Sequence, residues 1–168
     1  MKNLKKAPKI SFPVIILFFL LPFVTVKCGD YKIARLNGID LVTGTQITPQ
    51  NSGEDPVKVD PNIFVIAALS LAVIGGILAF LKFKLKNIIL LVICILGVAA
   101  LIAFYFNAKD SEAGQGTFVI IISMGVGYYL TLLGFLFNSF VFGYELANKE
   151  NSEIQKTTDN AAGNETNI

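Results

Sequence analysis

Long apolar stretches alternate with short polar segments along the chain. Four stretches, residues 10–26, 62–81, 88–106 and 118–142, contain no Lys, Arg, Asp or Glu. A hydrocarbon core about 30 Å thick is crossed by roughly 17 to 25 apolar residues in an α-helix. A helix on the surface of a soluble protein would show a polar face, and these stretches show none. The pattern predicts an all-α membrane protein with a four-helix transmembrane bundle.

The same pattern divides the chain into a membrane domain and a tail. Residues 1–143 are expected to form the four-span domain, with residues 27–61 as an outer loop. Residues 144–168 contain few large apolar side chains, so we expect a disordered cytoplasmic tail. The composition agrees, because 54% hydrophobic residues and a mean hydropathy of +0.64 do not fit one soluble domain with a polar coat.

The distribution of charge predicts the orientation. Residues 1–9 and 82–87 carry several Lys and no acidic residue, whereas acidic residues outnumber basic ones in residues 27–61 and 107–117. Positive charge favours the cytoplasmic side, which predicts an N-in, C-in protein of the cytoplasmic (inner) membrane. A cleaved signal peptide is the alternative for the first stretch. No small-x-small cleavage site follows that stretch, so we expect it to be retained.

Two local features of the first span and the outer loop predict backbone irregularities. Pro22 is expected to kink the first span, because it removes a backbone N–H. Asn37-Gly38 lies between two short mixed segments, which predicts a β-hairpin with a type I′ turn. A single helical turn across residues 38–44 is the alternative, and periodicity over so few residues does not separate the two. Residues 45–61 are expected to form a flexible tether.

One segment resembles a known pattern. Residues 21–29 read Leu-Pro-Phe-Val-Thr-Val-Lys-Cys-Gly, and Ile33-Ala34 and Leu41-Val42-Thr43-Gly44 follow. This succession resembles uncharacterised small bacterial multi-span membrane proteins with a Leu-Pro-Phe…Cys…Thr-Gly pattern after the first span. The resemblance is confined to residues 21–44 and departs at Lys27, where Ser is usual. It implies a bacterial cytoplasmic-membrane protein and carries no assigned activity.

Small residues recur four positions apart in two of the predicted spans. Such spacing lets helix backbones approach closely where lipid provides no hydrophobic drive for association. We therefore expect span two to pack against span four, and an interface between copies of the chain is the alternative. The candidate helix-packing residues are Ala68, Ala72 and Gly76 in span two and Ser123, Gly127 and Thr131 in span four.

Several single residues carry further expectations. Cys28 at the outer interface and Cys94 within span three lie at different depths, so they should not form a disulfide. We expect Cys94 to be a small buried residue. Tyr128 and Tyr129 place at least one hydroxyl deep in span four, where it needs a partner on its own or another span. Asn138 is expected to mark the inner interface.

The missing residue types limit the function. The chain has no His, and its apolar stretches contain no ionisable acid or base. Ion-coupled transporters, haem or metal carriers and membrane hydrolases need such groups. We therefore expect no catalytic, metal-binding or cofactor-binding residue, no enzymatic activity and no nucleic-acid partner.

Two functional interpretations follow from what remains. The first is a non-enzymatic structural or accessory subunit that contacts the lipid bilayer and either a membrane-protein partner or further copies of itself. The alternative is an oligomeric pore or permease for a neutral solute. A pore would show a continuous polar stripe along one span, and the sequence offers only a short polar patch in span four.

Overall fold

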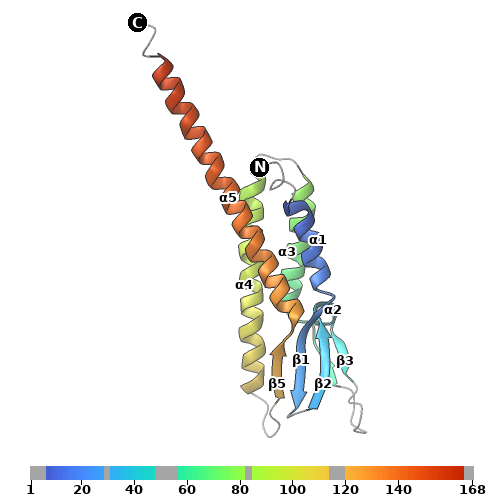
Figure 1. The fold of residues 1–168 in the computed structure, drawn as a ribbon. Helices are drawn as coiled ribbons and strands as arrows, with labels where there is room; N and C mark the ends of the chain where they lie inside the picture. The colour runs from blue at the N-terminus through green and yellow to red at the C-terminus, as the bar shows by residue number, and fades with distance from the viewer. Residues whose placement is uncertain (1–6, 29–30, 48–56, 82–84, 114–119, 165–168) are drawn as a thin grey trace.

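The computed structural model describes residues 7–28, 31–47, 57–81, 85–113 and 120–164. A group of long helices occupies most of the molecule, and a small β-rich part lies at one end (Figure 1). The elements in chain order are α1 (Ala7–Phe18), β1 (Pro22–Cys28), β2 (Tyr31–Asn37), α2 (Gly38–Thr43), β3 (Thr45–Ile47), β4 (Val57–Val59), α3 (Ile63–Phe80), α4 (Lys86–Ala113), β5 (Ile120–Met124) and α5 (Val126–Asn164).

Three of the described helices, α3, α4 and α5, are long and apolar enough to cross a membrane. The 18 residues of α3 correspond to a length of about 27 Å. Large apolar side chains remain exposed along all three helices, which fits contact with lipid tails. They include Val73, Ile74 and Ile77 on α3, Val92, Ile95 and Leu96 on α4, and Leu133, Phe137 and Phe140 on α5.

The first predicted span is not a single helix. α1 has 12 residues, which gives about 18 Å and is too short to cross a 30 Å hydrocarbon core alone. The chain turns after Phe18 and continues as β1 from Pro22. A kink at Pro22 was expected, and instead the helix ends before it. Pro22 opens the strand, where the missing N–H is tolerated, and the β-branched run Val24-Thr25-Val26 favours extended structure.

The fourth predicted span also begins differently. Its first part forms β5, and the helix starts only at Val126. β1, the strand after α1, pairs antiparallel with β5, so that Val24 lies opposite Met124 and Cys28 opposite Ile120. β1 also pairs antiparallel with β2, which makes a three-stranded sheet of order β2-β1-β5. The expected four-helix bundle is therefore not confirmed, because the described residues form three long helices together with the short helices α1 and α2 and small sheets.

The outer loop contains the helical turn and not the hairpin at Asn37-Gly38. β2 ends at Asn37 and α2 begins at Gly38. The backbone N–H of Asn37 donates to Asp40 Oδ2 at 2.9 Å, which stabilises the first turn of α2. Part of the predicted tether is ordered as a second small sheet, in which β3 pairs antiparallel with β4. Residues 48–56 of that tether lie outside the described residues.

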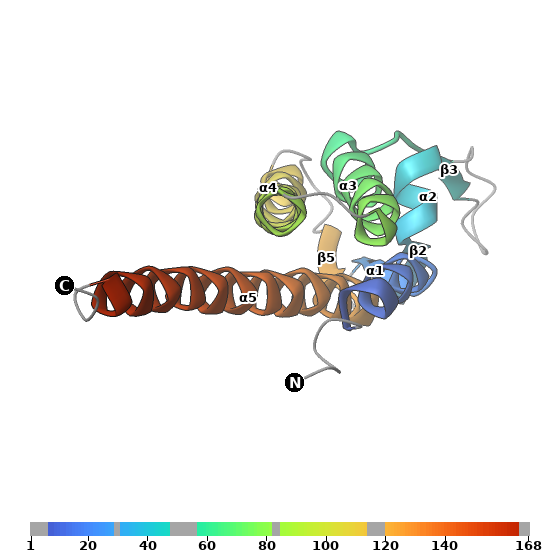
Figure 2. The ribbon, with the colours of Figure 1, turned by 90° about the horizontal axis from the view of Figure 1, so that it is seen from above.

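The helices form two layers when the molecule is viewed along the bundle. α3 and α4 lie in one layer and α1 and α5 in the other (Figure 2). α1 and α4 each pack against both α3 and α5. We expected α3 and α5 to be direct partners; their extensive contacts are instead with α1 and α4. Phe12 of α1 stacks on Phe142 of α5, with ring centroids 6.5 Å apart, and also lies against Gly75 of α3.

α5 and α4 both extend beyond their predicted spans. α4 continues to Ala113, through a segment expected to be a connecting loop. α5 continues to Asn164 and projects past the other elements (Figure 1), where composition predicted disorder. No Pro interrupts residues 143–164, and Ala, Leu, Lys, Glu and Gln within them favour a helix. Residues 165–168 of the predicted tail lie outside the described residues.

Candidate functional site

The β-rich end is a candidate site, because its surface is formed by strands and a short helix and not by the long apolar helices. We call it the β-cap and define it as β1 to β5 together with α2. Its connection to the helices is tight. The N–H of Gly125, between β5 and α5, donates to the carbonyl oxygen of Phe23 at 2.6 Å. A Cβ at Gly125 would collide with the carbonyl oxygen of Pro22, so glycine is required by the close approach of the two backbones.

Gly127 makes a second close approach in the first turn of α5. A Cβ there would lie 2.8 Å from the carbonyl oxygen of Leu21 and 2.9 Å from Phe23 Cδ2. The turn after α1 therefore packs directly on the start of α5. Because this contact is made largely by backbone atoms, it fixes the β-cap relative to α5 more strictly than side-chain packing would.

α2 connects the β-cap to the ends of α1 and α3. The N–H of Ile39 donates to the carbonyl oxygen of Phe19 at 3.2 Å, and the N–H of Asn62 donates to the carbonyl oxygen of Leu41 at 2.8 Å. Asn62 in turn caps α3, because its Oδ1 accepts from the N–H of Phe64 at 3.0 Å. The end of α1, α2 and the start of α3 are thus joined by successive hydrogen bonds.

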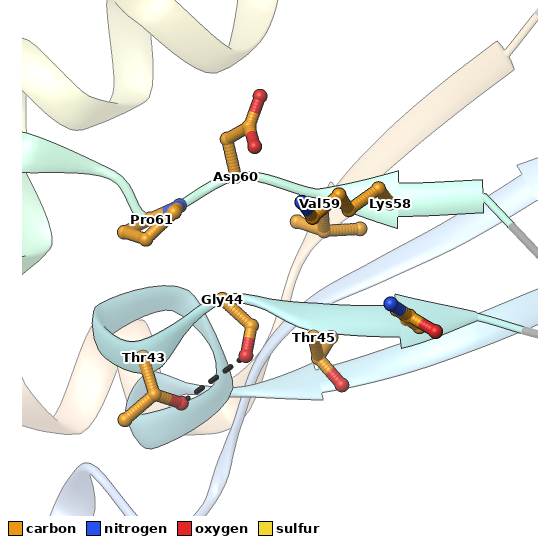
Figure 3. A pocket seen from close by; sticks show the side chains of 8 residues that line it. Thr43, Gly44, Thr45, Lys58, Val59, Asp60 and Pro61 are labelled. Atoms are coloured by element: carbon orange, nitrogen blue, oxygen red, sulfur yellow. Dashed lines mark hydrogen bonds between the residues drawn. The ribbon is translucent and has the colours of Figure 1, made fainter.

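A small groove lies on the β-cap between the end of α2 and the approach to α3 (Figure 3). Its volume is about 190 Å³, and its lining residues are Thr43, Gly44, Thr45, Gln46, Lys58, Val59, Asp60 and Pro61. Gly44 has a φ of 75°, a backbone conformation that favours glycine. A Cβ at Gly44 would also lie 3.1 Å from the carbonyl oxygen of Val59, so the two sides of the groove approach each other closely.

The chemistry of this groove suits contact with polar groups. It offers hydroxyls, one carboxamide, one ammonium and one carboxylate, and Lys58 and Asp60 are exposed. These groups can donate and accept hydrogen bonds and can pair with charges of either sign. Among the described residues, no group of three or more His, Cys, Asp or Glu could hold a metal ion.

The small residues predicted in span two are buried. Ala68 and Ala72 are fully buried, and Gly76 is also buried. A Cβ at Gly76 would lie 3.5 Å from Phe12 Cβ, so the glycine faces α1. The small face of α3 therefore receives the aromatic side chain of α1. Span four was the predicted neighbour, and the short helix α1 occupies that place.

The three small residues predicted in span four do not form one helical groove. Ser123 lies on β5 and is exposed. Gly127 is buried against the turn after α1. Thr131 is fully buried, and its hydroxyl donates to the carbonyl oxygen of Gly127 at 2.8 Å. The spacing indicated close packing but could not show that a strand precedes the helix.

The deep tyrosine pair separates into a buried and an exposed residue. Tyr128 is 4% exposed, and its hydroxyl donates to the carbonyl oxygen of Leu101 on α4 at 3.3 Å. Tyr129, the next residue along α5, is 52% exposed, and its ring lies edge-on to that of Tyr128 with the centroids 5.3 Å apart. The expected hydrogen bond between helices is present, although its acceptor is a backbone carbonyl. Tyr128 and Thr131 therefore have partners within the protein.

Asn138 is the residue that the sequence placed least well. It was expected at the inner interface, but its side chain is fully buried in the described structure. Neither its Oδ1 nor its Nδ2 has a hydrogen-bond partner. The signal available in the sequence was its spacing of seven from Thr131, which puts both on the buried face of α5.

Cys94 is fully buried and free, as expected for a small core residue. The backbone of Cys28 pairs with Tyr31 and Ile120 at the far end of β1, and its side chain lies outside the described residues. The resemblance over residues 21–44 stays a prediction, although those residues form the turn after α1, β1, β2 and α2. No protein-family model matches the chain, and no curated protein matches it significantly.

Proposed function

We propose that the protein is a non-enzymatic accessory subunit of a membrane assembly, and that its β-cap contacts a partner membrane protein. It would reside in the cytoplasmic membrane with both termini in the cytoplasm. The tight backbone connection between the β-cap and the helices carries this proposal. A surface that is fixed in this way keeps one orientation relative to the membrane, which favours recognition of a neighbour in the same membrane.

The groove between the end of α2 and the approach to α3 is the part of the β-cap best suited to such contact. It joins polar groups of both charge signs in a concave surface, and the adjoining α2 and α3 are tied together through Asn62. A partner loop or strand with polar side chains could fill it. Its volume of about 190 Å³ is small for an enzyme substrate, since ligand pockets usually measure about 300 to 1,000 Å³.

The proposed orientation is supported by the arrangement of the ends. α1 begins and α5 ends at the side of the molecule opposite the β-cap (Figure 1). The Lys-rich segments 1–9 and 82–87 adjoin that side in sequence, which favours its placement in the cytoplasm. Alkaline phosphatase fused after Glu112 should be active and fused after Lys149 inactive. The opposite result would overturn the orientation.

The function is tested by capture of the native assembly in mild detergent. The wild-type chain should retain a stoichiometric membrane-protein partner, and the double variant Lys58→Glu/Asp60→Lys should lose it with no change in net charge. The matched control is Lys109→Glu/Asp110→Lys, which exchanges two exposed charges at the end of α4. If no partner is retained by the wild-type chain, or if the groove variant retains it, the proposal is wrong.

The alternative, an oligomeric pore or permease for a neutral solute, has less support. Along the buried face of α5, Thr131 and Asn138 alternate with Phe135 and Phe142, all fully buried. Aromatic rings between the polar groups do not make the continuous polar stripe that a solute path needs. Thr131 is moreover bonded to the backbone of its own helix.

A further inference from the structure

Buried polar atoms without a partner are concentrated in one short part of the described chain. They are Asn138 Oδ1, Asn138 Nδ2, Ser139 Oγ and Glu145 Oε1, all within two turns of α5. The polar groups nearer the β-cap are satisfied, because Tyr128 bonds Leu101 and Thr131 bonds Gly127. The half of the bundle farther from the β-cap therefore differs chemically from the half beside it.

Asn138 is the extreme case. Its carboxamide has two donors and one acceptor oxygen, and the side chain is fully enclosed within the chain. An unpaired buried polar group destabilises a protein by about 1 to 3 kcal/mol, and lipid offers no water to relieve it. A second copy of the chain or a partner protein cannot reach a side chain that is already enclosed. Its partner must be small enough to fit inside the bundle.

The alignment of α4 and α5 shows which residue lies opposite. Asn87 Nδ2 donates to Glu145 Oε2 at 2.9 Å, and a Cβ at Gly97 would lie 2.6 Å from Phe135 Cε1. These contacts set an antiparallel register in which Cys94 lies level with Asn138. Cys94 is also fully buried, and its thiol is a weak hydrogen-bond donor and acceptor.

The nearby surface of α3 carries small residues. Gly75 and Gly76 face Phe12, and Phe12 stacks on Phe142, one turn from Asn138. These rings and glycines carry no polar side-chain atom that could bond the carboxamide. Glu145 lies two turns away along α5, which is about 10 Å, so Asn138 and Glu145 cannot bind the same ion.

We propose that Asn138 binds a water molecule enclosed between α4 and α5, with the Cys94 thiol as a second partner. A neutral ligand that both donates and accepts matches the carboxamide, and buried waters typically make about three hydrogen bonds to such groups. The site is independent of the β-cap and of the proposed partner. It would hold α4 and α5 together at a level where no direct hydrogen bond joins Asn138 to α4.

The test is nuclear magnetic resonance on the full chain in detergent micelles, with ¹⁵N in the asparagine side chains. The Asn138 carboxamide is assigned by the signal lost in Asn138→Leu, or in Asn138→Ala if the first variant does not accumulate. We expect direct dipolar cross-peaks between its amide protons and a long-lived water. The exposed side chain of Asn107 is the control and should show none. A folded wild-type protein without a water cross-peak at Asn138 would overturn the site.

A second pair of variants tests the role of Cys94. Cys94→Val keeps a buried apolar side chain but removes the thiol, so the water cross-peak at Asn138 should be lost or strongly weakened. Cys94→Ser keeps a hydrogen-bonding group at this position, so the cross-peak should remain. If Cys94→Val leaves the cross-peak unchanged in a folded protein, Cys94 is not a partner of the water.

Discussion

The contacts that stabilise the helical part differ in kind from those that stabilise the β-cap. In the helical part, large side chains pack against small ones, as Phe12 does against Gly75 and Gly76. In the β-cap, backbone groups meet directly, as Gly125 and Phe23 do at 2.6 Å. A side chain can move to accommodate a neighbour, whereas a backbone in a sheet has little freedom to do so. The junction of the two parts should therefore be the least tolerant place in the molecule.

Hydrogen bonding differs in the same way. The strands of the larger sheet in the β-cap satisfy their backbone through the pairs β2-β1 and β1-β5, and the second of these pairs joins segments far apart in the sequence. The long helices satisfy theirs internally, which is what the hydrocarbon core requires. The side-chain bonds that join helices within the described residues are single contacts, such as that of Tyr128 to Leu101. Deletions of single bonds in the helical part should consequently have small effects.

The largest effect is expected at the junction itself. In Gly125→Ala, the new Cβ collides with the carbonyl oxygen of Pro22, which is backbone and cannot rotate away. Overpacking typically costs 1 to 3 kcal/mol, and we expect about 3 kcal/mol or more here. The measurement is the free energy of unfolding in detergent. Gly143→Ala is the control, because nothing lies within 4 Å of its Cβ position. Equal stability of the two variants would remove the contrast between backbone and side-chain contact.

A smaller loss is expected within the helical part. Ala72→Leu and Gly75→Leu insert side chains into the buried face of α3, and Gly75 faces the Phe12 ring, which can shift. We expect each to lower the unfolding free energy by about 1 to 3 kcal/mol. Ile77→Ala, on the exposed face of α3, should lower it less because lipid refills the space. Loss of a dimer without loss of monomer stability would instead place this face in an oligomer interface.

The cap of α3 tests the boundary between the two parts. Asn62→Ala removes the acceptor for the N–H of Phe64 and also the 3.2 Å bond from Asn62 Nδ2 to Asn107 Oδ1. We expect a loss of about 1 kcal/mol in unfolding free energy. Asn107→Ala removes the bond from Asn62 Nδ2 but keeps the cap at Asn62, so it should cost less. A larger loss for Asn107→Ala than for Asn62→Ala would contradict the capping role.

The smallest effect is expected for the bond between α4 and α5. Tyr128→Phe removes the hydroxyl bonded to the carbonyl oxygen of Leu101 and keeps the ring in place. A loss of about 0.5 to 1.5 kcal/mol in unfolding free energy is expected. Tyr129→Phe is the matched control, since Tyr129 is 52% exposed and its hydroxyl should contribute little. If Tyr128→Phe lowered the unfolding free energy as much as Gly125→Ala, side-chain hydrogen bonds would stabilise the helical part more than we expect.

The sequence determined the features that depend on local composition. The apolar stretches 62–81 and 88–106 correspond to α3 and to the central part of α4, and the burial of Cys94 followed from its place among apolar residues. Length and hydrophobicity are sufficient for such helices, because a helix in lipid completes its own backbone hydrogen bonds. Neither the sequence of the residues that line the groove nor the resemblance over residues 21–44 predicts a particular partner.

Only the tertiary structure decided the rest. Residues 22–26 and 120–124 are rich in apolar and β-branched residues, so they fit a helix or a strand by composition. The pairing of β1 with β5 decides in favour of the strand. Asn138 is one polar residue near the end of an apolar stretch, which suggested an interface. It is buried in the structure, where α5 packs against both α1 and α4. A local sequence pattern determines elements, such as membrane helices, that complete their own backbone hydrogen bonds. Packing between distant segments decides elements, such as β1 and β5, whose backbone hydrogen bonds come from elsewhere in the chain.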